Sequence, residues 1–409
     1  MPERTDIFKR IRLLATCSLF FCILFFGACR RSADNYDSLA EILSSHAPMI
    51  KVMLCGDKIF SFNCAGSFQV CEENSSRIEM FLARSGEVPV SVESGRITID
   101  SIPFDGPVRI YSPKDGFTLN GRRYRGTITI HPSSGNPLAI NELPLEMYLA
   151  GVIASEMPER WPAEALKAQA VASRSYAISC IEARTGKLWH VRSTQASQVY
   201  DGVGEESGKI WDILAQTQGQ VLSQDGKSVL RAYFSSTCAG ATFDSRDVFH
   251  DPQNIPGVIC PFCAKSAKSV YLNWPELRIS RKEAYEKLIA NYPGLTELGG
   301  LKEIEITQTA ENGNLIKILK VGLVGETGKT DMLYGEDFRL TLDPSGTKFR
   351  STVCKVKVIE DEVVITDGHG FGHNVGMCQY GAKEMARENH NYRDILKHYY
   401  PGFKLEKVY

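Results

Sequence analysis

Short runs in which apolar and polar residues alternate characterise the chain between residues 48 and 135. Examples are RITI at 96–99, VRIY at 108–111 and TITI at 127–130, and glycine, aspartate and proline residues lie between them. A period of two buries one face of a β-strand, and the intervening residues are typical of turns. The pattern predicts a small β-rich module over 48–135, which ends near the turn residues of HPSSGNP at 131–137.

Helical spacing replaces this alternation after residue 140. In ELPLEMYLAGVIA, residues 142–154, apolar side chains recur on one side, which predicts a short helix. A break at Met157-Pro158 is followed by a longer helix over 162–183. Pro162 suits its first position, because the N–H that proline lacks would have no partner there.

From residue 280 onward the chain mixes both kinds of element. SRKE at 280–283 has the spacing of a capping box and predicts a helix to about residue 290. Asn312-Gly313, between two apolar runs, predicts a β-hairpin. A glycine-rich loop at 367–376 precedes helical segments that extend to Tyr400. The expected fold class is α+β, with a core over 140–405 preceded by the β-rich module.

The N-terminus has the features of an export signal. Three basic residues within 9–12 precede the apolar stretch LLATCSLFFCILFFGAC, which is short for a membrane-spanning helix. FFGAC resembles a bacterial lipobox in which Cys29 receives the lipid; a plain signal peptide or an uncleaved anchor is the alternative. We expect a signal peptide over 1–28, a tether over 29–47, and an exported protein held on the periplasmic or extracytoplasmic face by a lipid anchor.

Composition excludes one class of partner and leaves the cysteines ambiguous. With 47 basic and 48 acidic residues, the chain has no electrostatic sign of nucleic-acid binding. CPFC at 260–263 has the spacing of a zinc knuckle, and Cys238 and His250 are close in sequence. Cys238, His250, Cys260 and Cys263 would supply four tetrahedral ligands to a structural zinc ion. Disulfides, the default outside the cytoplasm, and free thiols stay open.

Several ordered blocks resemble the SpoIID/LytB domain family. They are NELPLEMYLAGVIASEMPERWPAEALKAQAVASRSYA at 141–177, STQASQVYDG at 193–202, YFSST at 233–237, GHGFGHNVGMCQYGAKEMA at 368–386 and YRDILKHYYPG at 392–402. The resemblance covers 140–405, and residues 30–135 carry no such match. Cys378 departs from the family pattern, in which many relatives have serine; it could join Cys238 in a disulfide or a metal site.

The resemblance implies a lytic transglycosylase that acts on peptidoglycan. Such enzymes cleave the MurNAc–GlcNAc bond, leave a 1,6-anhydro-MurNAc end, and favour strands that a cell-wall amidase has stripped of peptides. Glu156 matches their catalytic acid, and Arg174 matches an arginine implicated in the same reaction. The resemblance implies no cofactor for catalysis. LytB-type relatives are described as amidase modifiers, so a glycan-binding protein without cleavage is the alternative.

The chemistry of a single carboxylate agrees with this assignment. Hydrolytic glycosidases use two carboxylates, whereas ring closure by the sugar's own 6-hydroxyl needs only one acid/base. Glu156 must start protonated, so an apolar setting and a position at the end of the first helix are expected. The N-terminus of the second helix would instead favour the anion. For Arg174, contact with Glu156, a distant subsite and a structural ion pair all remain open.

Five further residues are candidates for substrate binding. They are Gln198, Tyr200, His373, Gln379 and Tyr380. Amide and aromatic side chains are common in sugar-binding grooves, but a packed tyrosine with a bonded hydroxyl explains Tyr200 equally well. His369 and His373 are four residues apart, as in a helical metal pair. The glycines between them argue against a helix, and His373 is expected to line the groove or brace its wall.

Overall fold

The computed structural model describes residues 43–409, except for 55–58, 65–66, 74, 76, 82–87, 94, 112–115, 133–136, 205 and 227. The predicted signal peptide, Cys29 and most of the tether lie outside the described residues. The chain forms two compact units. Unit 1 holds the described residues up to Glu159, with Ala177–Gly219 and Lys407–Tyr409; unit 2 holds Arg160–Tyr176 and Gln220–Glu406. No helix in the described part is long and apolar enough to cross a membrane.

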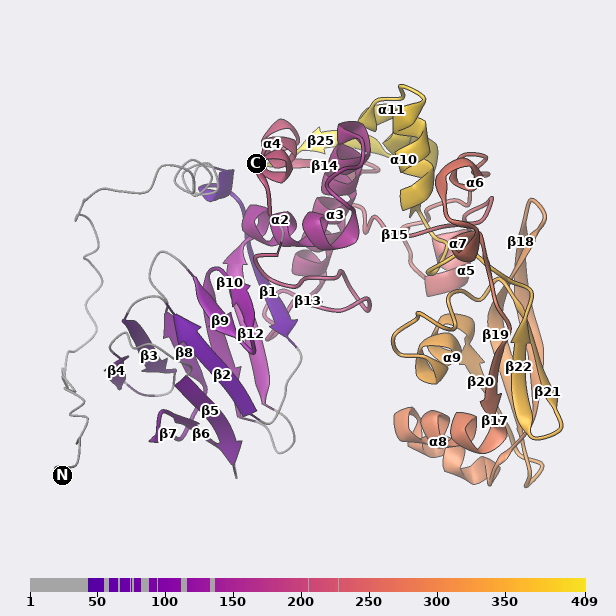
Figure 1. The fold of residues 1–409 in the computed structure, drawn as a ribbon, viewed down its shortest axis with the longest axis horizontal. Coiled ribbons are helices and arrows are strands. Elements are labelled where there is room, and N and C mark those ends of the chain that lie inside the picture. The colour runs from indigo at the N-terminus through magenta and orange to yellow at the C-terminus, as the bar shows by residue number, and fades with distance from the viewer. Residues whose placement is uncertain are drawn as a thin grey trace, which may run out of the picture. The chain divides into compact units, whose positions relative to one another are not determined.

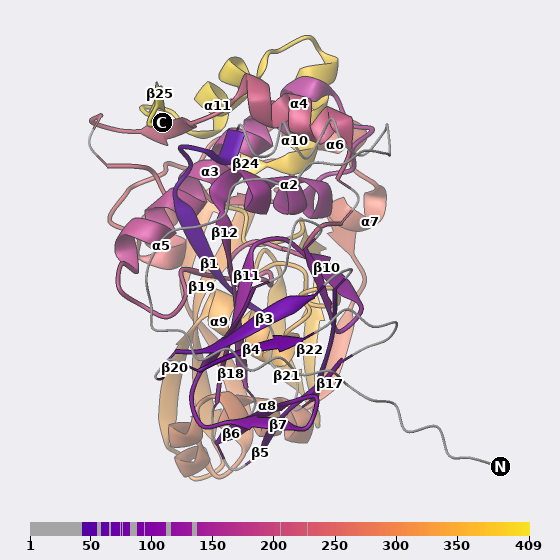
Figure 2. The same cartoon turned by 90° about the vertical axis from the view of Figure 1, so that its left-hand side faces the viewer.

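Two antiparallel sheets form most of unit 1 (Figures 1 and 2). One has the order β13-β1-β12-β11-β8-β3-β4, in which only the β13–β1 pair is parallel, and the other β10-β9-β2-β5-β6-β7. The strands are β1 (Met49–Leu54), β2 (Ile59–Cys64), β3 (Phe68–Glu72), β4 (Ile78–Phe81), β5 (Val88–Glu93), β6 (Arg96–Ile99), β7 (Ile102–Phe104), β8 (Val108–Tyr111), β9 (Phe117–Leu119), β10 (Arg122–Tyr124), β11 (Thr127–His131), β12 (Leu138–Pro144) and β13 (Val191–Arg192). The runs at 96–99, 108–111 and 127–130 are strands, as predicted. The rings of Phe62 and Phe68, one from each sheet, pack 4.8 Å apart between centroids.

The first helix begins later than its periodicity predicts. Helix α2 spans Leu145–Glu156, because the preceding residues to Pro144 pair with β1 as part of β12. It belongs to unit 1 together with α4 (Gly208–Gln216), so the described strands of the sheet module and α2 lie in the same compact unit. Helix α3 spans Ala163–Ala183 and follows Pro162, in agreement with the prediction.

Unit 2 is α+β with a core of its own, and α+β is the class of the whole chain. Its three-stranded sheets are β18-β19-β20 and β17-β22-β21, and its two-stranded pairs are β14-β25, β15-β24 and β16-β23. The elements are β14 (Gln220–Ser223), β15 (Phe234–Ser235), α5 (Ser245–Phe249), α6 (Cys263–Ser266), α7 (Ser269–Leu272), β16 (Asn273–Trp274), β17 (Leu277–Ser280), α8 (Arg281–Asn291), η1 (Pro293–Leu298), β18 (Leu301–Asn312), β19 (Leu315–Gly325), β20 (Thr330–Tyr334), α9 (Gly335–Leu342), β21 (Lys355–Ile359), β22 (Glu362–Thr366), β23 (Gly368–His369), β24 (Met377–Cys378), α10 (Gln379–Arg387), α11 (Tyr392–Tyr399) and β25 (Lys404–Lys407).

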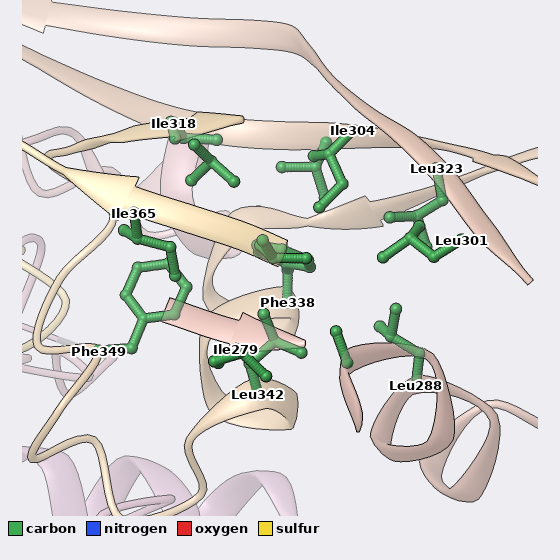
Figure 3. Close-up of a cluster of buried hydrophobic side chains, with 14 of the residues drawn as sticks. Ile279, Leu288, Leu301, Ile304, Ile318, Leu323, Phe338, Leu342, Phe349 and Ile365 are labelled. Carbon is green, nitrogen blue, oxygen red and sulfur yellow. The ribbon is translucent and has the colours of Figure 1, made fainter. Parts of the chain in front are cut away.

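Side chains from helices and both three-stranded sheets fill this core (Figure 3). Leu288 of α8 and Phe338 of α9 share one buried cluster with Ile304, Leu323 and Ile365 of the strands. The predicted cap and hairpin are both present. The Ser280 hydroxyl accepts the Glu283 N–H at 3.2 Å, and Gly313 turns the β18–β19 hairpin with φ 60°.

The glycine-rich segment is not helical: it combines short β-pairings with left-handed turns, and it is held against residues 233–243. Met377 and Cys378 pair with Phe234 and Ser235 in parallel, and Phe371 forms a bridge with Thr237. A Cβ on Gly376 would lie 2.0 Å from the Tyr233 carbonyl oxygen, so only glycine allows this approach. The pairing places α10 directly after the loop.

Candidate functional site

Glu156 is the last residue of α2, at the helix end that the sequence predicted. The backbone leaves the helix at Met157, whose φ and ψ are −133° and 131°. The Glu156 side chain is half-buried, and its neighbours in sequence Val152, Ile153 and Met157 are fully buried. Its Oε1 accepts the Val199 backbone N–H at 3.0 Å. The structure therefore holds this carboxyl group in one orientation beside an apolar interior.

Gln198 and Tyr200 flank Val199, and both side chains point into the interior of unit 1. Gln198 and Tyr200 are each 1% exposed. The Tyr148 hydroxyl donates to Gln198 Oε1, and the Tyr200 hydroxyl donates to Asn141 Oδ1, both at 3.0 Å. Burial raises the pKa of Tyr200 well above its ordinary value, which keeps this donor protonated. These two residues position the Val199 N–H, and through it Glu156.

Close packing of α2 on the same segment completes this arrangement. A Cβ on Gly151 would lie 2.4 Å from the Gly202 carbonyl oxygen and 2.9 Å from the Tyr200 ring. The Tyr200 and Tyr148 ring centroids are 5.0 Å apart. Any larger residue at position 151 would push α2 away from the Val199 segment. Gly151 is a residue that the sequence analysis did not single out.

Arg174 is fully buried within α3 and belongs to unit 2, whereas Glu156 belongs to unit 1. Its Nη1 donates to the Gln220 carbonyl at 3.2 Å. The adjacent Ser175 hydroxyl accepts the Leu222 N–H at 2.9 Å. Both residues link α3 to β14. The partner of Arg174 in this link is the backbone carbonyl of Gln220.

Four aromatic side chains gather in unit 2 around Tyr380, and we refer to Trp161, Tyr271, Phe371 and Tyr380 as the aromatic cluster. The ring of Tyr380 lies 5.0 Å from that of Trp161 and 5.6 Å from that of Tyr271, which is 5.8 Å from Phe371. All except Trp161 are partly exposed. Neither Tyr271 nor Phe371 was among the residues expected to bind substrate, although Phe371 lies in the block 368–386.

Cations surround the same rings. The Lys383 ammonium lies 5.1 Å from the Trp161 centroid and 5.2 Å from the Tyr380 centroid. The Arg350 guanidinium lies 5.4 Å from Phe371, and the Lys268 ammonium 6.0 Å from Tyr271. Such contacts hold long side chains at the rings by cation–π attraction. The cluster combines apolar ring faces with positive charge.

His373 and Gln379 brace the glycine-rich segment from inside. The His373 ring lies 5.1 Å from Phe249 and 6.0 Å from Tyr233, and its Nδ1 accepts the Val375 N–H at 3.1 Å. Gln379 is 6% exposed, and its Nε2 donates to Gln169 Oε1 at 3.4 Å. Through these contacts His373 and Gln379 help to hold the glycine-rich segment in place.

Stability is expected to fall in mild acid because of His373. Burial, with Lys317 and Arg339 nearby and partly offset by Glu336, lowers the pKa of His373 to about 4. An unfolded histidine titrates near 6.5, so between about pH 6.5 and 4 the unfolded chain binds the extra proton. We expect the unfolding free energy to drop by about 2–3 kcal/mol as the pH falls through this interval.

Urea unfolding of wild type and His373→Gln at pH 7.5, 6, 5 and 4 measures this effect. The variant should lose less stability than the wild type over the same interval, because its amide does not titrate. Identical pH slopes in the two proteins would contradict the assignment to His373. Other histidines act equally in both proteins and cancel in the difference.

Three of the predicted zinc ligands come together, and the fourth member of the cluster is Cys378. Cys238, Cys260, Cys263 and Cys378 are fully buried, and their sulfur atoms all lie within 4.8 Å of one another. His250 is not part of this cluster. It ends α5 in a left-handed turn with φ 53°, and its ring packs against Tyr334 with centroids 4.5 Å apart. His250 is close to Cys260 in sequence, but after this turn its ring packs on Tyr334 and not beside the cysteine sulfur atoms.

Comparison with known proteins identifies the family. The model of the stage II sporulation protein SpoIID matches residues 133–223. The stage II sporulation protein D of Bacillus subtilis is 31% identical, over 66% of this chain and 76% of its own. An uncharacterized protein of Brachyspira hyodysenteriae is 35% identical, over 72% and 75%. The amidase enhancer of Bacillus subtilis is 30% identical over 81% of this chain, which spans about half of that longer protein (52%).

This chain belongs to the SpoIID family. The matched segment 133–223 contains Glu156, Val199 and both residues that flank Val199. The aromatic cluster, apart from Trp161, and the four cysteines lie beyond it.

Proposed function

We propose that the protein is a peptidoglycan lytic transglycosylase that uses Glu156 as its single acid/base. Membership of the SpoIID family supports a cell-wall-related role. The observation that carries the enzymatic assignment is the setting of Glu156, an oriented and half-buried carboxyl group at the end of α2. In a residue that was only solvated at a helix break, the side chain would not be fixed by a backbone N–H that buried Gln198 and Tyr200 hold in place.

The mechanism requires Glu156 in two protonation states, and its surroundings serve both. The C-terminal end of α2 carries negative partial charge, which favours the neutral acid. The Val199 N–H donates to Oε1 in either state and favours the carboxylate once it forms. In the first step the acid protonates the oxygen that leaves C1 of MurNAc. The carboxylate then takes the proton of the 6-hydroxyl, whose oxygen bonds to C1 and closes the 1,6-anhydro ring.

The aromatic cluster is a suitable surface for the glycan strand. Sugar rings present flat apolar faces of C–H bonds, which pack well on partly exposed aromatic rings such as Tyr271 and Tyr380. Removal of the stem peptide by an amidase leaves a lactyl carboxylate on each MurNAc. Lys383, Arg350 and Lys268 supply positive charge beside the rings, where they could pair with the lactyl carboxylates of a peptide-stripped strand.

The cell-wall amidase is the upstream partner in this proposal, because it produces the stripped strand. A relative named amidase enhancer supports a link of this kind. Export and lipidation at Cys29 would place the enzyme at the membrane surface that faces the peptidoglycan.

Mass spectrometry of digests tests the proposal. Peptidoglycan, intact and amidase-stripped, is incubated with the full-length protein and the products are analysed. We expect muropeptides or glycans that end in 1,6-anhydro-MurNAc, at a higher yield from the stripped substrate. Products with ordinary reducing ends would instead demonstrate hydrolysis and a second carboxylate.

An amidase modifier without its own activity is the second candidate, and the name of the same relative favours it. That candidate expects no cleavage by the protein alone, binding to stripped glycan, and faster digestion when an amidase is added. Incubation of the protein alone with glycan that an amidase has already stripped therefore separates the two functions, because only the transglycosylase releases 1,6-anhydro-MurNAc ends from it.

A further inference from the structure

Four cysteines from three separate segments meet in the interior of unit 2. Cys238 follows β15, Cys260 and Cys263 lie in the CPFC turn that opens α6, and Cys378 ends β24. All four are fully buried, and their sulfur atoms lie within 4.8 Å of one another. Cys354, another thiol of unit 2, is not part of this cluster.

The sulfur separation fits coordination of one metal ion. The Cys238 and Cys263 sulfur atoms are 3.7 Å apart. Four thiolates at a Zn–S distance of about 2.3 Å form a tetrahedron whose edges are about 3.8 Å long. A disulfide would require about 2.05 Å and would join the cysteines only in pairs. The observed geometry therefore matches a set of four converging ligands.

Neighbouring donors and a glycine complete the surroundings of the sulfurs. Cys378 Sγ accepts the N–H groups of Cys238 at 3.3 Å and of Gly381 at 3.4 Å, and the Tyr399 hydroxyl lies 3.1 Å from Cys260 Sγ. Donors of this kind stabilise metal-bound thiolates. A Cβ on Gly381 would lie 2.8 Å from Cys260 Sγ and 1.9 Å from the Tyr399 oxygen, so the space around the sulfurs excludes any side chain there.

We propose that Cys238, Cys260, Cys263 and Cys378 bind one structural Zn²⁺ ion. Four thiolates close the coordination sphere and leave no position for water or substrate, which makes the site structural rather than catalytic. The ion would tie the CPFC turn to the glycine-rich loop at the start of α10. Because Tyr380 lies in the first turn of α10, the zinc would hold this member of the aromatic cluster in place. The inference does not depend on the proposed enzymatic activity.

Metal analysis of the full-length protein, purified in detergent without added metal, tests the proposal. We expect about one zinc ion per chain. Cobalt taken up after removal of zinc should give the intense visible bands of tetrahedral thiolate coordination. A protein without zinc whose four thiols react with a thiol reagent in the native state would overturn the proposal. So would iron in place of zinc, or disulfides detected as loss of two hydrogens per bond.

Ligand variants and a matched control locate the ion. Cys260→Ser and Cys378→Ser should lose the zinc, whereas Cys354→Ser, which removes a thiol of the same unit outside the cluster, should retain it. Zinc retained by both ligand variants would contradict the assignment. If either ligand variant fails to fold, the zinc content and cobalt spectrum of the wild type and of Cys354→Ser decide the question.

Discussion

Glu156→Gln is expected to abolish the formation of 1,6-anhydro-MurNAc ends. The amide keeps the size of the side chain and can still accept the Val199 N–H, but it neither protonates the leaving oxygen nor takes the proton of the 6-hydroxyl. Loss of general acid/base catalysis corresponds to a rate lower by about 10²–10⁴-fold. Product release from amidase-stripped peptidoglycan, followed by mass spectrometry, measures the change.

Glu159→Gln is the matched control for this variant. Glu159 lies three residues away, is exposed, and also belongs to unit 1. It should retain the wild-type rate, and both variants should bind stripped glycan with wild-type affinity. An active Glu156→Gln would remove the acid/base role from this residue and assign the cleavage to another group.

Glu336→Gln is expected to destabilise unit 2 by about 3–5 kcal/mol, the range for removal of one partner from a buried ion pair. Glu336 Oε1 lies 2.7 Å from the Lys317 ammonium and Oε2 lies 2.9 Å from Arg339 Nε. Burial alone would raise the pKa of Glu336, but these two cations hold it below its ordinary range. The amide leaves both cations buried without a counter-charge. Hydrogen exchange of the β19 amides and urea unfolding measure the loss.

An exposed ion pair in the same unit provides the comparison. Glu297 contacts Lys329 at 2.7 Å, and both side chains are more than half exposed. Glu297→Gln should change stability by no more than about 1 kcal/mol, because solvent screens the pair. Equal effects of the two substitutions would mean that the buried pair contributes no more than a surface pair.

Local patterns were sufficient where neighbouring residues determine the conformation. The strands at 96–99, 108–111 and 127–130 alternate with a period of two, and each is a strand in the structure. The start of helix α3 after Pro162 and the cap formed by Ser280 with Glu283 each depend on residues within a single helical turn. The end of α2 at Glu156 also follows locally, because Met157-Pro158 cannot continue the helix.

Long-range pairing decided the features that the sequence did not predict. Helix α2 begins only at Leu145 because the residues before it, in β12, pair with β1. Strand β1 lies some 90 residues earlier in the chain, so a local sequence pattern cannot reveal this pairing. The burial of Gln198 and Tyr200 depends on Tyr148 and Asn141, which lie in other elements. Their role as supports of Val199 is therefore a property of the packed unit.

Family blocks and residue chemistry were enough to select Glu156, the α+β class and three of the four clustered cysteines. The sequence offered Cys378 only as a possible partner of Cys238, and the tertiary structure placed it in the cluster instead of His250. The tertiary structure also packed Tyr271 between Phe371 and Tyr380. The reason is physical: short-range preferences act through adjacent backbone and side chains, whereas these groups meet only after strands far apart in sequence have paired. The sequence thus named the side chains that are candidates for chemistry, and the fold decided which side chains surround them.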